Sequence, residues 1–255
     1  MIRVAAVGDV HVGVDSAGRL RPRLEHVADV ADVFLLAGDL TRCGSPEEAA
    51  VLVDELSGLG VPVIAVLGNH DYHADREVEL RRTLERGGVT VLEGESTIVD
   101  VGGVRLGVAG GKGFGGGFAG ACGSEFGEPE MKAFMHHSRQ LAGGIARALE
   151  ALDTDYKVAL MHYAPVADTL VGERLEIYPF LGSYLLAEAV DQAGADLVIH
   201  GHAHGGTEKG VTAGGVHVRN VAMPVIRQAY AVYTLGGDDH ARIGYDDRRV
   251  SAAAR

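Results

Sequence analysis

Apolar runs rich in β-branched residues alternate, over the first ninety residues, with segments in which apolar positions recur every three to four residues. Unbroken apolar runs are typical of parallel strands buried on both faces, and the wider spacing is typical of amphipathic helices. This part of the chain therefore predicts a βαβαβα order with helical crossovers. Ser45-Pro46 marks one helix start, because Ser is a preferred N-cap and Pro suits the first turn. The expected strands cover 2–7, 33–37 and 61–67, and the expected helices cover 22–30, 46–56 and 76–86.

The alternation of strand and helix patterns ends after this region. Short strands follow one another without a helix between them, and Gly102-Gly103 predicts a tight hairpin. We therefore expect a mixed or second sheet to begin here. The expected elements are strands at 89–92, 97–101 and 104–109, a helix at 129–152, a strand at 157–161, a helix at 185–192, a strand at 197–199, and second-sheet strands at 216–221 and 229–235.

Length and composition are those of an ordinary globular chain. Because 255 residues contain no linker-like stretch, we expect one domain over residues 1–255, with the tail beyond about residue 238 loosely ordered. Hydrophobic residues make up 47% and charged residues 23% of the chain, which is compatible with a sizeable core. Cys43 and Cys122 are too few for a disulfide framework, so we expect reduced thiols.

The net charge and the distribution of basic residues limit which classes of binding partner are expected. The 23 basic and 35 acidic residues give a net charge of −12, and the basic residues are scattered along the chain. This argues against nucleic acid and favours a small or locally captured anion. The chain enters a strand at Ile2 without a basic leader, and no apolar stretch is long enough to span a bilayer. We expect a cytoplasmic protein without a membrane partner.

Five short polar motifs follow or end apolar runs. They contain Asp and His, which bind borderline divalent metals, and Asn, whose amide oxygen is a weaker neutral ligand. Ligands of parallel sheets collect outside the carboxyl ends of the strands, so the five loop tips can converge on one point. The motifs are Gly8-Asp9-Val10-His11, Gly38-Asp39, Gly68-Asn69-His70-Asp71, His162 and Gly201-His202-Ala203-His204.

Together the motifs point to a two-metal hydrolytic centre. Each motif alone is weak, since Gly-Asp after a strand is usually a turn and a lone His is usually a core or surface residue. Two ions about 3.5–4 Å apart need a bridging carboxylate. Asp39 stands alone in its loop and is the best candidate for that bridge. His200, beside the last motif, is expected to pack rather than to bind metal.

The complete series from Asp9 to His204 resembles that of the calcineurin-like metallophosphoesterases. The family pattern is Asp-x-His, Gly-Asp, Gly-Asn-His-(Asp/Glu), His and Gly-His-x-His, in this order. The resemblance implies an α/β fold, namely a four-layer α/β/β/α sandwich with two mixed β-sheets flanked by helices. It also implies two divalent or trivalent metal ions, with Mn, Fe or Zn expected. By position, one ion would be held by Asp9, His11, Asp39 and His204, and the other by Asp39, Asn69, His162 and His202.

The resemblance further implies an enzyme that hydrolyses a small phosphodiester or phosphomonoester by attack of a metal-bound hydroxide. An acid then protonates the leaving oxygen, and His70 is our candidate for this role. Asp71 would orient the His70 imidazole and hold it cationic. The alternative for Asp71 is a plain turn or helix-start residue.

Three further residues are candidates for contact with the substrate. Arg42 follows the Gly-Asp motif and either clamps a phosphate oxygen or forms a surface ion pair. Lys112 and Phe114 lie in the glycine-rich segment 110–117, which is either a flexible rim loop or a packed connection. The segment contains a formal GxGxxG pattern, but no helix pattern follows, which argues against dinucleotide binding.

Three functions stay open at this point. The motifs resemble those of bacterial class III cyclic nucleotide phosphodiesterases, which makes small diesters the leading substrates and leaves monoesters open. A nuclease of the same family is disfavoured by the scattered basic residues. A non-catalytic scaffold of the same fold would not need to keep every ligand, and all of them are present here. The oligomeric state is left without a prediction.

Overall fold

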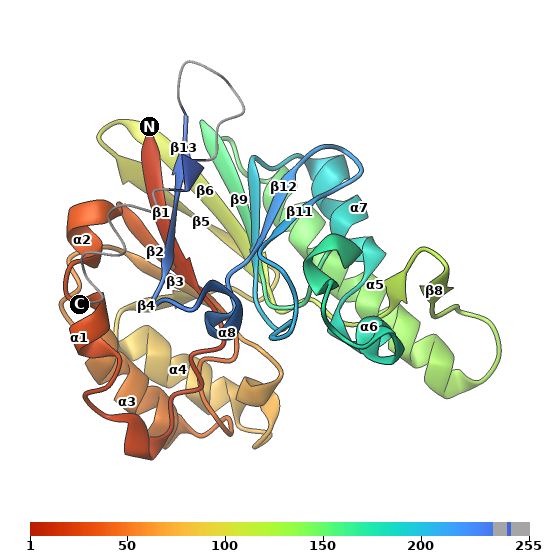
Figure 1. Ribbon diagram of the computed structural model, residues 1–255, viewed down its shortest axis with the longest axis horizontal. Coiled ribbons are helices and arrows are strands. Elements are labelled where there is room, and N and C mark those ends of the chain that lie inside the picture. The colour runs from red at the N-terminus through yellow and green to blue at the C-terminus, as the bar shows by residue number, and fades with distance from the viewer. Residues whose placement is uncertain (237–243, 246–255) are drawn as a thin grey trace.

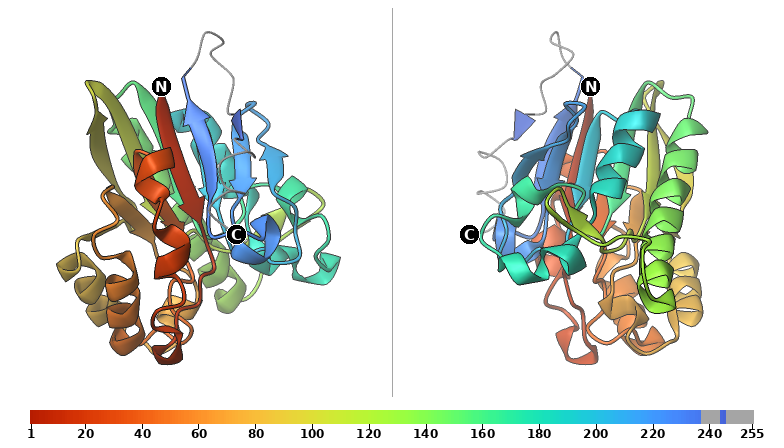
Figure 2. Two further views of the ribbon diagram at one scale, coloured as in Figure 1. Left: turned by 60° about the vertical axis from the view of Figure 1, so that its left-hand side comes forward. Right: turned by 90° about the vertical axis from the view of Figure 1, so that its right-hand side faces the viewer.

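The computed structural model describes residues 1–236 and 244–245. Two six-stranded sheets face each other, with helices on the outer side of each (Figures 1 and 2). Contacts of β2 and β3 in one sheet with β9 and β6 in the other hold the two inner faces together. The four-layer α/β/β/α sandwich with two mixed sheets, expected from the sequence, is confirmed.

The first sheet has the strand order β14-β13-β1-β2-β3-β4. Its members β1 to β4 are parallel, whereas β13 runs antiparallel to β1 and β14 antiparallel to β13. The strands are β1 (Ile2–Val7), β2 (Val33–Ala37), β3 (Val63–Val66), β4 (Val89–Val91), β13 (Ala231–Leu235) and β14 (Gly244–Tyr245).

Two expectations about this sheet are wrong. The strand expected at 229–235 in the second sheet lies in the first, where β13 pairs with β1. The second sheet does not begin at residue 89 either, because β4 completes the first sheet beside β3. An apolar pattern identifies a strand but does not identify its neighbour, which depends on distant residues. The tail expectation lies outside the described residues, except for β14.

The second sheet has the strand order β11-β12-β10-β9-β6-β5. Its four central strands are parallel, and both edge strands are antiparallel to their neighbours. The hairpin predicted at Gly102-Gly103 is confirmed: Val101 pairs with Val104, and both glycines have positive φ, as a two-residue hairpin turn requires. The strands are β5 (Glu95–Val101), β6 (Val104–Gly111), β9 (Tyr156–Met161), β10 (Leu197–His200), β11 (Lys209–Val211) and β12 (His217–Asn220). A separate two-stranded sheet contains β7 (Gly117–Phe118) and β8 (Ala121–Cys122).

The helices form the two outer layers. The N-cap predicted at Ser45 is confirmed, because its side chain accepts a hydrogen bond from the Glu48 backbone N–H at 3.1 Å. The single helix expected at 22–30 is instead two short helices. The α-helices are α1 (Arg21–Leu24), α2 (Val27–Val30), α3 (Pro46–Leu56), α4 (Glu77–Arg86), α5 (Pro129–Glu150), α6 (Tyr178–Leu181), α7 (Tyr184–Ala193) and α8 (Met223–Ile226), and the 3-10 helices are η1 (Val14–Ser16), η2 (His70–Tyr72), η3 (Ala167–Leu170) and η4 (Leu175–Ile177).

The hydrophobic core occupies all three interfaces between the four layers. One cluster joins the inner faces of both sheets and reaches α3 and α4, and another joins the outer face of the second sheet to α5 and α7. Burial on both faces explains why the central strands read as unbroken apolar runs. In the part of the chain described here, no helix combines the length and the apolar character that crossing a bilayer requires.

Candidate metal centre

The loops that follow β1, β2, β3, β9 and β10 bring the predicted ligands together. Metal-capable atoms of neighbouring side chains lie within 4.8 Å of one another in two groups, and both groups contain Asp39. Asn69 adds to the second group, since its Oδ1 lies 3.0 Å from His162 Nε2. The first cluster is Asp9, His11, Asp39 and His204; the second cluster is Asp39, Asn69, His162 and His202.

The first cluster is partly open to solvent. His204 Nε2 lies 2.8 Å from Asp9 Oδ1, and His11 Nε2 lies 3.8 Å from Asp39 Oδ2. Burial raises the pKa of Asp9 to about 6, although the hydrogen bond from His204 opposes this. The same hydrogen bond raises the pKa of His204, whereas burial lowers that of His11. A cation at this cluster would offset the burial cost of Asp9 and favour its charged form.

The second cluster is the more enclosed of the two, because none of its members is exposed, although Asn69 and His202 are only half-buried. We call it the closed cluster and the first one the open cluster. His162 is fully buried and donates its Nδ1 hydrogen to the Ala37 carbonyl at 2.9 Å, which directs Nε2 at the other ligands. Burial lowers the pKa of His162 to about 3 and that of His202 to about 3. Both imidazoles are therefore neutral near pH 7, which is the form that coordinates metal.

Two buried histidine nitrogens, one in each cluster, have the surroundings expected of metal ligands. His11 Nε2 is buried and has no hydrogen-bond partner. Because Nδ1 of His162 carries the hydrogen, its Nε2 presents a lone pair to Asn69 Oδ1 at 3.0 Å and to Asp39 Oδ1 at 3.3 Å. Asp39 Oδ1 accepts from the His70 backbone N–H at 2.8 Å, but His162 Nε2 and Asn69 Oδ1 face each other as two acceptors. A positive charge between these two atoms would relieve their repulsion.

The backbone at the centre is strained. Among the described residues, six that are not glycine have positive φ, and four of these are cluster members. Each such conformation costs on the order of 1–3 kcal/mol and persists only where the surroundings enforce it. The strain turns side chains at strand ends toward one point. The four are Asp9, His11, Asp39 and His202.

Glycines in the motifs make room for ligands from other motifs. A Cβ at Gly38 would collide with the His162 ring, and one at Gly68 would collide with Asp39. A Cβ at Gly201 would likewise collide with the Asp9 carboxylate. These glycines are therefore needed for close approach between distant segments rather than for turns alone.

Comparison with known proteins agrees with this geometry. A family model described as calcineurin-like phosphoesterase matches residues 2–206, which contain every member of both clusters. The chain belongs to the calcineurin-like phosphoesterase family.

Relatives of this phosphoesterase chain include one curated protein and several solved structures. A probable cyclic nucleotide phosphodiesterase of Synechococcus is 38% identical over 80 residues, which are 28% of this chain and 31% of that protein. The chain therefore matches about a third of the length of that relative. Phosphopantetheinyl hydrolase from Mycobacterium tuberculosis has 18% identity and a TM-score of 0.63, over 88% of this chain and 90% of that chain. A Thermus thermophilus protein has 16% identity and a TM-score of 0.56, over 91% and 93%. At these identities the two structures show the shared fold.

The family is described as phosphoesterases and implies divalent metal ions, and the two clusters of this chain could hold them. Neutral imidazoles, buried carboxylates and one amide oxygen suit borderline divalent ions.

His70 lies beside the first cluster, but Asp71 does not orient it. His70 Nε2 is 4.0 Å from Asp39 Oδ2, and its Nδ1 lies 2.9 Å from the Arg42 carbonyl, which can only accept. The expectation that Asp71 orients His70 is therefore wrong. The buried Asp71 carboxylate instead accepts hydrogen bonds from the backbone N–H groups of Leu40, Thr41 and Gly68 and from the Thr41 hydroxyl, at 2.6–3.1 Å.

The predicted substrate contacts have different surroundings. The Arg42 guanidinium pairs with Asp15 at 2.9 Å, which is the surface ion pair that the sequence left open. Lys112 is buried directly after β6, with Nζ 4.6 Å from the centroid of the Tyr72 ring and 5.0 Å from that of Phe114. Burial lowers the pKa of Lys112. Segment 110–117 is almost wholly buried. Of the two alternatives for this glycine-rich segment, it is therefore the packed connection and not the flexible rim loop.

The sequence did not reveal several groups that support the clusters. The carbonyls of Ala37 and Arg42 carry no sequence signal, because every residue has one. Asn220 was also missed; its buried side chain donates to the Ala203 carbonyl at 2.8 Å and so supports the loop between His202 and His204. An Asn ending an apolar strand is a signal that could have identified it. His200 packs as expected, with Nε2 2.9 Å from the Thr169 hydroxyl.

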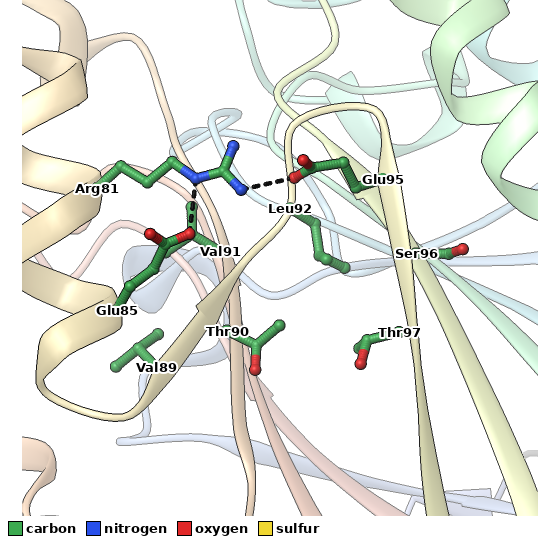
Figure 3. A pocket seen from close by; sticks show the side chains of 9 residues that line it. All are labelled: Arg81, Glu85, Val89, Thr90, Val91, Leu92, Glu95, Ser96 and Thr97. Carbon is green, nitrogen blue, oxygen red and sulfur yellow. Dashed lines mark hydrogen bonds and ion pairs between the residues drawn. The ribbon is translucent and has the colours of Figure 1, made fainter.

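A separate cleft of about 560 Å³ lies where the chain passes from the first sheet to the second (Figure 3). It is lined by β4, the start of β5 and the side of α4. Arg81 crosses it to hydrogen-bond Glu85 and Glu95, each at 2.8 Å. None of the candidate site residues lines this cleft, so we assign the chemistry to the strand ends.

Proposed function

We propose that this chain is a phosphoesterase that hydrolyses a small phosphodiester or phosphomonoester at two metal ions bridged by Asp39. The observation that carries the proposal is the pair of ligand clusters with one shared carboxylate. The unpartnered His11 Nε2 and the facing acceptors of the second cluster support it. Mn, Fe and Zn all suit such a mixed N and O donor set.

Bound ions of this kind supply positive charge to the phosphate oxygens and acidify a water molecule. The residues of the chain hold and direct the reacting groups. The closed cluster keeps its imidazoles neutral and its geometry fixed through the bond from His162 to Ala37. The open cluster leaves space for substrate, because His11 and His204 are partly exposed.

His70 is the proposed general acid. The Arg42 carbonyl accepts from Nδ1, which leaves Nε2 facing Asp39 and the space above the open cluster. A proton on Nε2 can then pass to the leaving oxygen. Asp71 acts at a distance, since its hydrogen bonds tie the loop after β2 to the loop after β3.

Substrate recognition is proposed from three residues. Lys112 contributes a buried positive charge, and Phe114 contributes a ring beside Tyr163, with centroids 5.7 Å apart. Arg42 can reach an anion only by leaving Asp15. Cyclic nucleotides are the leading diesters because the Synechococcus relative is named a probable cyclic nucleotide phosphodiesterase. The net charge of −12 argues against nucleic acid.

A substrate panel tests the proposal. Purified protein is analysed for bound metal and assayed with bis-p-nitrophenyl phosphate, p-nitrophenyl phosphate, cyclic nucleotides and single-stranded DNA, with added Mn²⁺ and with chelator. We expect metal-dependent hydrolysis of at least one small ester. Hydrolysis of DNA alone would favour a nuclease, and a metal-loaded protein that hydrolyses none of the four would favour a scaffold.

A further inference from the structure

Exposed apolar side chains gather in one segment beside the candidate centre. Eleven large apolar residues are exposed among the described ones, and four of these fall within residues 171–180. Such side chains are ordinary when scattered, but their concentration on a folded surface marks a binding site. We call these four the apolar rim: Val171, Leu175, Ile177 and Phe180, exposed by 37–73%.

The apolar rim is anchored to the body of the protein. The backbone N–H of Ala164 donates to Leu181 at 3.0 Å, that of Gly116 donates to Pro179 at 2.7 Å, and the Tyr178 hydroxyl donates to Leu170 at 2.9 Å. All three bonds involve residues of α6, so the exposed side chain of Phe180 stands on an anchored helix. α6 packs against the small sheet of β7 and β8 (Figure 1).

A series of aromatic rings leads from the rim to the metal cluster. The ring of Phe180 is 6.5 Å from that of Phe134, which is 5.2 Å from Phe114. Phe114 is 5.7 Å from Tyr163, whose ring lies 4.3 Å from that of His202. The Phe180 carbonyl also lies 3.3 Å from His202 Nε2. A continuous series of packed rings thus connects the exposed Phe180 to a proposed metal ligand, with Tyr163 buried within it.

We propose that the rim and this ring series form a subsite for an apolar chain carried by the phosphate ester substrate. The inference rests on the proposed function and narrows its substrate class to esters with an alkyl or acyl group. Burying such a chain removes apolar surface of both partners from water, a gain that grows with chain length. A compact polar ester would leave the rim exposed.

Charge favours a single amphiphilic substrate over an anionic bilayer as the occupant. Residues 168–180 contain Asp168, Glu173 and Glu176 against Arg174 alone, within a chain of net charge −12. Surfaces that bind anionic membranes are instead rich in Lys and Arg around their apolar residues. Glu173 also accepts from the Gly205 backbone N–H at 2.6 Å, which ties the rim to the loop of His204.

A homologous substrate series tests the inference. Methyl, butyl and octyl esters of p-nitrophenyl phosphate differ only in the chain that would occupy the subsite. We expect kcat/KM of the wild type to rise at least about tenfold from methyl to octyl, well below the ceiling set by roughly fourfold per buried CH₂. The double variant Leu175→Ser with Phe180→Ser should lose this rise while it still hydrolyses the methyl ester. Val211→Ser, at an exposed apolar position on β11, should keep it.

Binding provides a readout that does not need turnover. Calorimetric titration with methyl-, butyl- and octylphosphonate should show the same dependence on chain length in the wild type and none in the double variant. Equal binding and equal kcat/KM across each series would overturn the inference, and hydrolysis of all three esters would leave the proposed function intact. Failure to hydrolyse any ester, with chain-dependent phosphonate binding retained, would count against the proposed function alone.

Two other occupants are outcomes of the same experiment. If the double variant turns a wild-type dimer into a monomer in sedimentation, the rim is an interface between copies and the substrate subsite is refuted. If phosphatidylcholine vesicles bind the wild type but not the variant, and the ester series is flat, the rim binds a membrane and the inference also fails.

Discussion

The two ligand clusters share Asp39 but differ in their exposure to solvent. The side chains of His204 and His11 keep 43% and 24% of their surface exposed, whereas that of His162 keeps none. A closed set of ligands holds an ion in fixed geometry, while an open set leaves a position for water or substrate. From this contrast we propose that the half with His162 mainly holds its ion and that the half with His11 and His204 faces the substrate. His70 stands on the side of His11, with its ring 4.6 Å from that of His11.

The largest effect is expected from Asp39→Asn, which removes the carboxylate that both halves share. Loss of a supporting partner alone lowers metal affinity by roughly 10- to 100-fold, so loss of the shared ligand should cost both ions about 100-fold or more. Turnover should fall to that of chelator-treated wild type. Atomic absorption and ester hydrolysis measure the two effects. Asp54→Asn, at an exposed position on α3, is the matched control. Retention of two ions by the Asp39 variant would contradict the role of Asp39 as the shared ligand.

The next effect concerns the open half. His70→Ala should lower turnover of an ester with a poor leaving group by roughly two to four orders of magnitude, as expected for loss of acid catalysis. Bound metal should be unchanged, because His70 lies in neither cluster. With p-nitrophenolate, which leaves without a proton, the loss should be much smaller. His26→Ala is the surface control. Equal losses with both leaving groups would refute acid catalysis by His70.

The histidines of the two halves should also contribute differently to the free energy of unfolding. In metal-free protein, His162→Ala should lower the free energy of unfolding by about 2–4 kcal/mol, because it leaves a cavity and an unpaired Ala37 carbonyl. His11→Ala should cost less than about 1 kcal/mol, because its side chain is partly exposed and its Nε2 has no hydrogen-bond partner. Urea unfolding monitored by circular dichroism gives both values. Similar losses for the two variants would mean that the closed half is no better packed than the open one.

The smallest effect provides a baseline remote from the centre. Asp32 pairs with Arg3 at 2.7 Å. Burial raises the pKa of Asp32, but the hydrogen bonds and charge of Arg3 outweigh it, so the net pKa is below the usual 3.8. The pair therefore stabilises the fold above about pH 4 and loses that contribution as the pH falls through the folded value. Asp32→Asn should cost roughly 0.2–1 kcal/mol at pH 7 and nothing well below pH 3, in urea unfolding at each pH. A change in metal content would contradict its role as a remote control.

Local patterns in the sequence identified most strands and helices, but they did not identify the neighbouring strand in every case. Strand and helix periodicities depend on neighbouring residues, so β1, β2, β9 and α3 were expected close to their observed bounds. The sheet to which β13 belongs depends on β1, more than 220 residues away along the chain, and the prediction failed there. That the chain forms one domain stays a prediction.

The candidate ligands were visible as residue types at strand ends, whereas their supports were not. Asp71 illustrates the limit: adjacency in sequence suggested a bond to His70, but the side chain turns to amides of Leu40 and Thr41 about thirty residues earlier. The Ala37 and Arg42 carbonyls that direct His162 and His70 are backbone groups, which no residue pattern distinguishes.

The sequence by itself determined the chemistry available to this protein: five motifs of Asp, His and Asn at the ends of apolar strands, in the order of one metal-dependent family. Only the tertiary structure decided which cluster is closed and which is open, and why the glycines stand where they do. The reason is physical. Side-chain identity is a local property, but exposure, ligand direction and the absence of room for a Cβ at Gly38 or Gly68 arise from segments that meet only after folding.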